Sequence, residues 1–413
     1  MNNPPIDRFN IVYFIFFFQG IGMLFPWNVF MNASEYFRLR FIGSSWADNF
    51  QSYFAIAFML CNCSFIALLM YTKVDHKFSL PVRVVSGLVM NGFVFLLSTM
   101  LTAFDSFAPD SFFFITMGSI LLCGISTGIL QKGLFGLAGE FPPIYTQAIM
   151  NGQGIAGLVV TLSAIFTTLL SSNDYHDVKS VNQSAFLYFL VSLLVILISC
   201  ASFVLLTRAP IYRYYTLASK RQIHVDEKKN SSSESLVQKD TSATFLPIDN
   251  QEDFIHVEPS FLNVFSEIKW FIISIFNIFF VTLTLFPSLR MIGQVGNSIP
   301  NKIFPAFVNL IFQIGDVIGK TLPSIGRIKI EVHMPNFFNQ DYQAFLIILV
   351  MAISNGYIAS ILMMRAPQKV SNTLFREYAG SLMALALTLG LTAGALFSFA
   401  LRAMLCRCNP FVS

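Results

Sequence analysis

Long runs of apolar residues, separated by short polar intervals, recur along most of the chain. Each run holds about 20 mostly apolar residues, the length that an α-helix needs to cross a bilayer. The runs are continuous and do not alternate, which favours helices over a barrel because a helix satisfies its own backbone groups in lipid. The pattern predicts an all-α, polytopic membrane protein with about ten spans, near 10–31, 50–72, 81–104, 112–137, 144–170, 184–206, 268–289, 303–325, 343–364 and 379–405.

A polar interval at 207–267 separates the sixth run from the seventh. It is rich in Ser, Asp, Glu and Lys, a composition that cannot bury a core. We therefore predict three parts: an N-terminal six-helix bundle at 1–206, a disordered cytoplasmic linker at 207–267, and a C-terminal helix bundle at 268–413.

Basic residues set the predicted orientation in the membrane. Arg208 and Arg213 closely follow the sixth run, and Lys73, Lys77 and Arg83 flank the connection between the second and third runs. Cytoplasmic loops carry an excess of Lys and Arg, so both places and the N-terminus are predicted to be cytoplasmic.

The same orientation places the loop near 171–183 outside the membrane. This loop contains Asn182-Gln183-Ser184, a glycosylation sequon on the correct side of the membrane, although close to the next span. Asn182 is therefore a candidate glycosylation site.

The composition excludes several classes of protein. The chain is 55% hydrophobic and 12% charged, too few charges to cover a soluble protein, and its net charge of +4 gives no nucleic-acid footprint. The sequence has no nucleophile–base arrangement, no zinc-ligand spacing and no phosphate loop. We therefore expect no enzyme activity, no cofactor or metal, no nucleic-acid partner and no obligate protein partner; the expected surroundings are a lipid bilayer.

Two charged residues lie inside the run FVNLIFQIGDVIGKTLPSI. Asp316 and Lys320 are four residues apart, so they share a helical face, which Gln313 extends. An ionised group at a helix centre costs about 2.5–3.5 kcal/mol on insertion scales and is usually turned inward. Two interpretations remain open: a structural ion pair, or a polar face that lines a solute path near the middle of the membrane.

Three amide side chains occupy other spans and favour the solute path. Asn28 lies in the first run, Gln131 in the fourth and Gln153 in the fifth. Glycines surround both glutamines, in GISTGILQKGLFGLAG and AIMNGQGIAG. Glycine allows close helix packing and tolerates irregular backbone beside a cavity, although it is also typical of plain helix interfaces.

The first span contains an unusual cluster, GIGMLFPWNVFMNASEYF, at 20–37. Pro26 frees a backbone carbonyl one turn earlier, which a cavity-lining helix tolerates. Trp27 offers a flat face to a ring, Asn28 can bond a polar solute, and Met31 adds an adaptable apolar wall. Together these groups suit a ligand made of a base and a sugar.

These segments resemble those of the equilibrative nucleoside transporters. The resemblance covers most of the chain and rests on LFPWNVFMNASEYF (24–37), GILQKGLFGLAG (128–139), IMNGQGIAG (149–157), VTLTLFPSL (281–289), IGDVIGK (314–320), SNGYIASILMMRAPQKV (354–370) and AGSLMALALTLGLTAGALFSF (379–399). It implies facilitated diffusion of nucleosides, and sometimes of nucleobases, by alternating access between two helix bundles.

The resemblance also implies roles for individual residues. By position, Trp27 and Met31 would flank the base, Gln131 would hydrogen-bond it, and Asp316 would bind the ribose hydroxyls. Lys320 stands where the family has arginine; lysine is a point charge and arginine a planar fork, so the solute geometry would be read less strictly. Asn28, Gln153 and Phe286, which lies within VTLTLFPSL, complete the expected binding set.

The interval 326–342, GRIKIEVHMPNFFNQDY, departs from the family. Relatives have a ninth span there, and eleven in all, whereas this interval is too short and too charged to cross lipid and return. Either one helix is missing, in a variant or an incomplete sequence, or the last two helices are re-threaded. We favour the first option and expect the last two spans to pack as in relatives, with a gap or a long crossing strand where the missing helix belongs.

Alternative functions follow from the same residues. A chain that lacks one helix could be a non-transporting or impaired variant. Proton-coupled transport would use Asp316 as the titrating group, but a carboxylate paired with Lys320 should stay ionised. Facilitative nucleoside transport in the plasma membrane, in preference to an internal membrane, is therefore the prediction.

Overall fold

The structure is a computed structural model of the whole chain. It describes residues 5, 7–47, 49–72, 78–104, 107–170, 178–216, 261–292, 304–324, 341–372 and 375–406. The helices of the first half are α1 (Ile11–Asn32), α2 (Ser34–Arg40), α3 (Phe50–Thr72), α4 (Leu80–Leu101), α5 (Pro109–Glu140), α6 (Pro143–Leu170) and α7 (Val178–Arg208). Those of the second half are α9 (Phe261–Ile292), α10 (Phe304–Thr321), α11 (Asp341–Lys369) and α12 (Arg376–Cys406).

Every predicted apolar run forms a long helix, so the all-helical prediction is confirmed. Two helices begin earlier than expected, because α7 starts at Val178 and not near 184, and α9 starts at Phe261 and not near 268. The predicted linker is therefore helical at both edges, where residues 210–216 also form a helical turn, and its centre, 217–260, lies outside the described residues.

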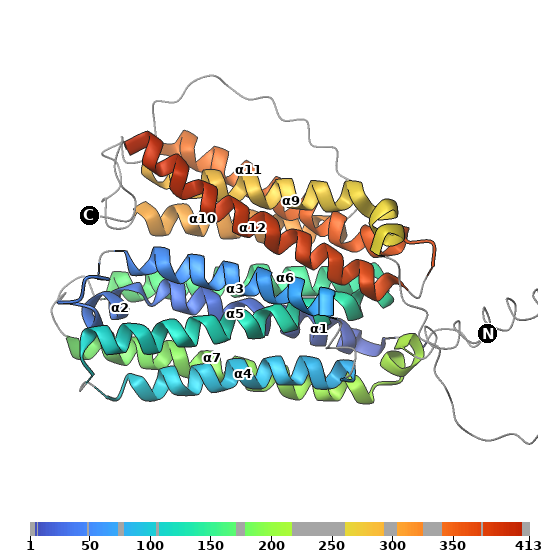
Figure 1. Cartoon of the computed structure of the whole chain (residues 1–413), viewed down its shortest axis with the longest axis horizontal. Helices are drawn as coiled ribbons and strands as arrows, with labels where there is room; N and C mark the ends of the chain where they lie inside the picture. The colour runs from blue at the N-terminus through green and yellow to red at the C-terminus, as the bar shows by residue number, and fades with distance from the viewer. Residues whose placement is uncertain are drawn as a thin grey trace, which may run out of the picture.

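The spanning helices form two bundles that lie as layers against each other (Figure 1). Helices α1 and α3–α7 make the first bundle, and α9–α12 make the second. Within the described residues, nine helices are long and apolar enough to cross a membrane. The remaining long helix, α10, carries Asp316 and Lys320, and it packs between α6 of one bundle and α11 of the other.

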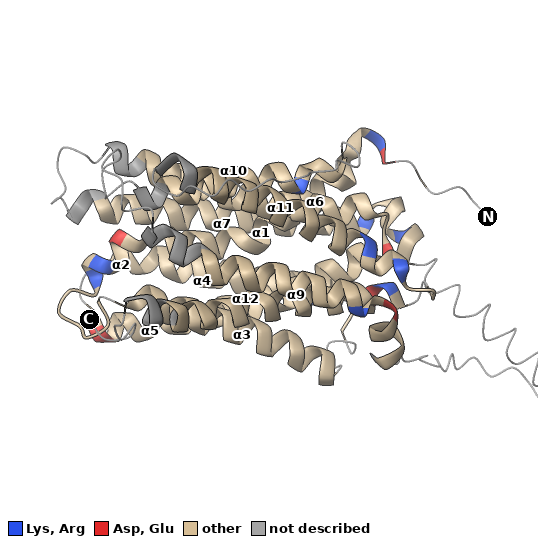
Figure 2. Cartoon of the chain, turned by 90° about the horizontal axis from the view of Figure 1, so that it is seen from above, with Lys and Arg blue, Asp and Glu red and all other residues tan. Residues whose placement is uncertain are grey.

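Basic side chains mark one end of both bundles. Figure 2 shows Lys and Arg gathered at the end where the N-terminus lies, with a smaller group beside α2 at the opposite end. Arg83 lies in the first turn of α4, Arg208 ends α7, Lys369 ends α11 and Arg376 begins α12. The positive-inside rule therefore assigns the N-terminal end to the cytoplasm.

Helix directions in the second bundle follow from the close contacts of its glycines. Gly315 packs against Leu349, and Gly319, one turn later, packs against Ile353, so α10 and α11 run parallel. The contacts of α12 with α9 progress in the same way, which makes that pair parallel as well. The segment 325–340 lies outside the described residues, and the helix ends that it joins are at opposite ends of the bundle.

Candidate functional site

The charged pair of α10 is buried at the boundary between the bundles. The Lys320 ammonium lies 2.6 Å from Oδ2 of Asp316, one turn apart on the helix. Asp316 is 5% exposed and Lys320 7%, so neither charge faces lipid. The aliphatic stem of Lys320 contacts Gly154 of α6, across the bundle boundary. The predicted polar face of α10 is therefore turned inward, toward α6 and α11.

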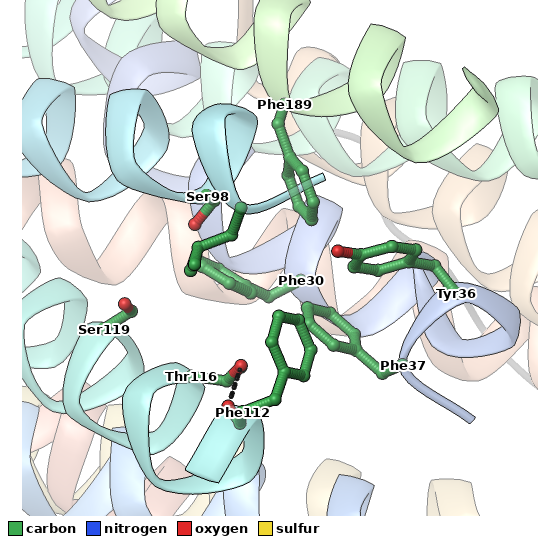
Figure 3. A pocket seen from close by; sticks show the side chains of 9 residues that line it. Phe30, Tyr36, Phe37, Ser98, Phe112, Thr116, Ser119 and Phe189 are labelled. Atoms are coloured by element: carbon green, nitrogen blue, oxygen red, sulfur yellow. Dashed lines mark hydrogen bonds between the residues drawn. The ribbon is translucent and has the colours of Figure 1, made fainter. Parts of the chain in front are cut away.

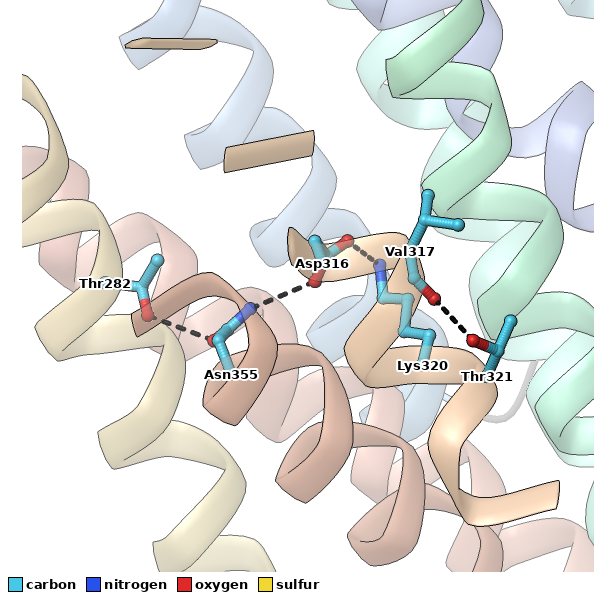
Figure 4. Close-up of polar contacts among 6 residues, drawn as sticks. All are labelled: Thr282, Asp316, Val317, Lys320, Thr321 and Asn355. Carbon is cyan, nitrogen blue, oxygen red and sulfur yellow. Dashed lines mark hydrogen bonds and ion pairs between the residues drawn. The ribbon is translucent and has the colours of Figure 1, made fainter. Parts of the chain in front are cut away.

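A chain of hydrogen bonds extends from this pair into two other helices (Figure 4). Asn355 of α11 donates from Nδ2 to Oδ1 of Asp316 at 3.3 Å. Thr282 of α9 donates its hydroxyl to Oδ1 of Asn355 at 3.0 Å. Asn355 and Thr282 were not among the residues expected from the sequence, although each is a polar residue inside an apolar run and could have been found by the rule that selected Gln131.

A second polar pair lies in the first bundle. Asn62 of α3 donates from Nδ2 to Oε1 of Gln131 at 3.2 Å, and both side chains are buried. Close by, the hydroxyl of Thr392 on α12 donates to the carbonyl of Met59, so α3 meets the second bundle at this depth. Gln131 therefore lies on the side of its bundle that α12 approaches.

The residues of the first span that were singled out from the sequence are Trp27, Asn28 and Met31. Trp27 stacks one face of its indole on Phe58, with ring centroids 4.1 Å apart, and stays only partly buried. Asn28 donates to the carbonyl of Leu24 at 3.0 Å, within its own helix, which continues through Pro26 to Asn32. Met31 is partly buried near the outer end of α1.

The remaining residues singled out from the sequence are Gln153, Phe286 and Asn182. Gln153 donates to the sulfur of Met23 at 3.0 Å, which directs it into the first bundle. Phe286 belongs to α9, but its side chain is outside the described part of the chain. Asn182 is partly buried within α7, so its sequon lies in a helix and not in the expected loop.

The sequence comparisons place this arrangement in a known class. A family model described as nucleoside transporter matches residues 117–331 and 325–403. The chain belongs to the nucleoside transporter family. It is 29% identical to human equilibrative nucleoside transporter 1, over 98% of this chain and 99% of that protein. It is 24% identical to Arabidopsis thaliana equilibrative nucleotide transporter 1, over 96% of this chain and 87% of that protein.

Solved structures of other transporters share the fold of this family member. A single-site variant of the E. coli fucose:proton symporter FucP superposes with a TM-score of 0.57 at 12% identity, covering 98% of this chain and 94% of that chain. The proton:xylose symporter XylE, bound to 6-bromo-6-deoxy-D-glucose, gives a TM-score of 0.56 at 12% identity, covering 97% and 90%. At this identity the likeness concerns the fold alone: an integral, multi-pass, two-bundle transporter.

The bundles of this transporter are joined at the cytoplasmic end by an ion pair. Arg83 of α4 and Glu377 of α12 approach to 3.3 Å, with side chains 11% and 31% exposed. Tyr212, in the helical turn after α7, lies near this pair: burial, with the carboxylates of Glu140 and Glu377, raises the pKa of Tyr212 to about 12. The phenol is therefore neutral at physiological pH.

Further hydrogen bonds donated by side chains reinforce the same end of the transporter. Gln368 of α11 donates to the carbonyl of Phe141 at 3.2 Å, and Ser381 of α12 donates to the carbonyl of Lys132 at 3.2 Å. Gln147 of α6 donates to the hydroxyl of Ser324 at 2.6 Å. Figure 1 shows α12 lying against the first bundle at this end and tilting away from it toward the other end.

A cavity inside the first bundle is separate from these polar groups (Figure 3). Its walls are mainly aromatic and come from Phe30, Tyr36, Phe37, Ser98, Leu101, Phe112, Thr116, Ser119 and Phe189. The hydroxyls of Ser98 and Thr116 donate to carbonyls of their own helices. Among the described side chains, none of the expected binding residues lines it, so we assign it to packing within the bundle.

Proposed function

We propose that this chain carries nucleosides across the membrane by facilitated diffusion, with the two bundles opening alternately to either side. The observation that carries the proposal is the Asp316–Lys320 pair, buried where α10 meets α6 of the other bundle. Charges are rare within the membrane and usually mark a solute path when they face the bundle interior. The near full-length similarity to equilibrative nucleoside transporters supports the choice of solute.

In this proposal each bundle supplies part of the binding site. Asp316 accepts hydrogen bonds from ribose hydroxyls, and Lys320 balances its charge. Gln131 hydrogen-bonds the base, while the face of Trp27 opposite Phe58 stacks on it. The remaining expected contacts are Asn28, Met31, Gln153 and Phe286.

The conformation fits one stage of such a cycle. Arg83–Glu377 and the Gln368 and Ser381 hydrogen bonds join the bundles at the cytoplasmic end. We propose that this is the state closed to the cytoplasm, and that the cycle takes place in the plasma membrane.

Uptake of radiolabelled uridine and adenosine into cells that express the chain tests the proposal. We expect saturable uptake that does not depend on a pH gradient, and a loss of at least about 10-fold in Asp316→Asn, because a hydrogen bond to a charged group contributes about 1.5–3 kcal/mol. Surface biotinylation corrects for the amount of protein. Absence of uptake by the wild-type chain at the cell surface would mean that it does not transport, and uptake driven by a proton gradient would mean coupled transport.

A further inference from the structure

Asn355 lies at the middle of α11 and connects three helices of the second bundle. Its Nδ2 donates to Oδ1 of Asp316 at 3.3 Å, and its Oδ1 accepts from the Thr282 hydroxyl at 3.0 Å. Asn355 is 6% exposed and Thr282 4%, so both hydrogen bonds are shielded from solvent and lipid. Figure 4 shows the four side chains in sequence, from Thr282 on α9 to Lys320 on α10.

The orientation of the Asn355 amide follows from the chemistry of its neighbours. A carboxylate only accepts hydrogen bonds, so the amide nitrogen must face Asp316. The amide oxygen then faces Thr282, whose hydroxyl donates to it. Thr282 therefore holds the amide in the orientation that Asp316 requires.

The backbone around this chain of hydrogen bonds leaves little freedom to rearrange. Gly356, the residue after Asn355, contacts the backbone of Asp316 and of Lys320. Gly319 contacts the backbone of Ile353 in the same seam. Close packing of two helices through glycine fixes their register, so the distance between Asn355 and Asp316 is fixed as well.

The two oxygens of Asp316 are thus held from opposite sides. Lys320 engages Oδ2 and Asn355 engages Oδ1. A carboxylate offers about four acceptor positions, two on each oxygen. After these two contacts, each oxygen retains one position, which matches a solute that presents two adjacent hydroxyl groups.

We propose that Asn355, held by Thr282, is a positioning residue that aims the Asp316 carboxylate at the vicinal hydroxyls of the solute, and so sets the preference for ribose over deoxygenated sugars. The proposal rests on the transport function proposed above. It predicts that loss of Asn355 weakens recognition of the sugar and leaves recognition of the base intact. A merely structural hydrogen bond between helices would change both equally.

The test compares KM for uridine with KM for 2′,3′-dideoxyuridine, which has the same base and lacks both hydroxyls. In the wild-type chain we expect KM for uridine to be the lower of the two. Asn355→Leu should raise KM for uridine about 10-fold, because the charge-assisted hydrogen bonds from the sugar hydroxyls to Asp316 lose their orientation. KM for dideoxyuridine should stay within about 2-fold of the wild-type value. Uptake is divided by the amount of protein at the surface.

Thr282→Val keeps the side-chain shape and removes only the hydroxyl. It tests the same proposal if the Asn355→Leu protein does not reach the membrane. It should raise KM for uridine about 3-fold, as expected for a neutral hydrogen bond that acts through another residue. Thr161→Val is the matched control, because the Thr161 hydroxyl accepts from Asn309 at 3.1 Å, about two turns before Asp316 on α10. This control should leave the KM ratio unchanged.

The outcomes separate the two proposals. A wild-type chain that takes up uridine but does not discriminate against dideoxyuridine would overturn the role of Asn355 and leave the transport function standing. An equal rise in both KM values, or an unchanged ratio in Thr282→Val, would also overturn it. Absence of any uridine uptake by the wild-type chain would overturn the transport function itself.

Discussion

Replacing Glu377 by glutamine keeps the size of the side chain and removes the charge that faces Arg83 across the bundle boundary. The two groups lie 3.3 Å apart at the cytoplasmic end, one on α4 and the other on α12. If this end must separate during transport, the pair stabilises the closed state and is lost in the open one. Glu377→Gln should therefore shift the population toward the state open to the cytoplasm.

The size of the shift follows from the distance and the exposure. Two unit charges 3.3 Å apart attract by about 1 kcal/mol in water and about 5 kcal/mol at an effective dielectric constant of about 20. Exposed pairs retain about 0.2–1 kcal/mol after desolvation and side-chain entropy are subtracted. Arg83 is 11% exposed and Glu377 31%. We therefore expect the net stabilisation by this pair to lie above the value for fully exposed pairs and below the roughly 5 kcal/mol of the unopposed attraction. A net loss of about 1–2 kcal/mol changes the ratio of closed to open states about 5- to 30-fold.

Cysteine accessibility measures this population directly. A Ser381→Cys reporter is suited to it, because Ser381 is 4% exposed and bonded to the backbone of α5 in the closed state. In inside-out vesicles, an impermeant maleimide should label the reporter about 5- to 30-fold faster when Glu377→Gln is added. Labelling at residue 381 is read by mass spectrometry, which separates it from the native cysteines.

Glu267→Gln provides the control for this assay. Glu267 also lies at the cytoplasmic end, but it accepts hydrogen bonds from Ser371, within the second bundle. Its substitution should leave the labelling rate of the reporter unchanged. Equal acceleration by both substitutions, or none by Glu377→Gln, would refute the role of the Arg83–Glu377 pair in closing the cytoplasmic end.

Three further predictions concern α10, the last helix and the topology. Lys320→Ala should sharply lower the amount of folded protein at the surface, since it leaves Asp316 as an unpaired buried charge, which costs about 3–5 kcal/mol. Lys320→Arg keeps the pair and should leave this amount unchanged, and surface biotinylation compares the two variants. Gly319→Ala should also reduce folded protein, because the new methyl group meets the backbone of Ile353; thermal stability in detergent measures the loss. A tag after Ser413 should be accessible to antibody on intact cells and an N-terminal tag only after permeabilisation, because α12 starts at the cytoplasmic end.

The positions of the spanning helices could be predicted from the sequence because lipid demands long apolar segments with internal hydrogen bonds. The exceptions are instructive. The helix α2, at Ser34–Arg40, is too short to give an apolar run, and it forms because Tyr36 and Phe37 are buried against the first bundle. The early starts of α7 and α9 include polar residues, which hydropathy assigns to loops.

The candidate site could be predicted only in part. Asp316 and Lys320 stood out because an isolated charge in lipid is expensive, and their spacing of four showed that they could pair. Asn355 and Thr282 give a weaker signal, since an amide or hydroxyl inside a span is less costly and has many possible partners. Their importance comes from the packing of α9 and α11 against α10, which no local pattern specifies.

The direction of α11 decides between two interpretations of the ten apolar runs. Counting runs alone makes α11 antiparallel to α10, whereas a missing helix, the option favoured from the sequence, makes the two helices parallel. Contacts at three depths require the parallel direction: Leu349 with Gly315, Asn355 with Asp316, and Gln368 with the carbonyl of Phe141. Reversing α11 about its centre could keep Asn355 in place, but it would move Gln368 to the outer end and Leu349 to the inner end. The polar contacts at mid-membrane and at the cytoplasmic end can therefore be made together in one direction only, and the number of apolar runs does not equal the number of crossings.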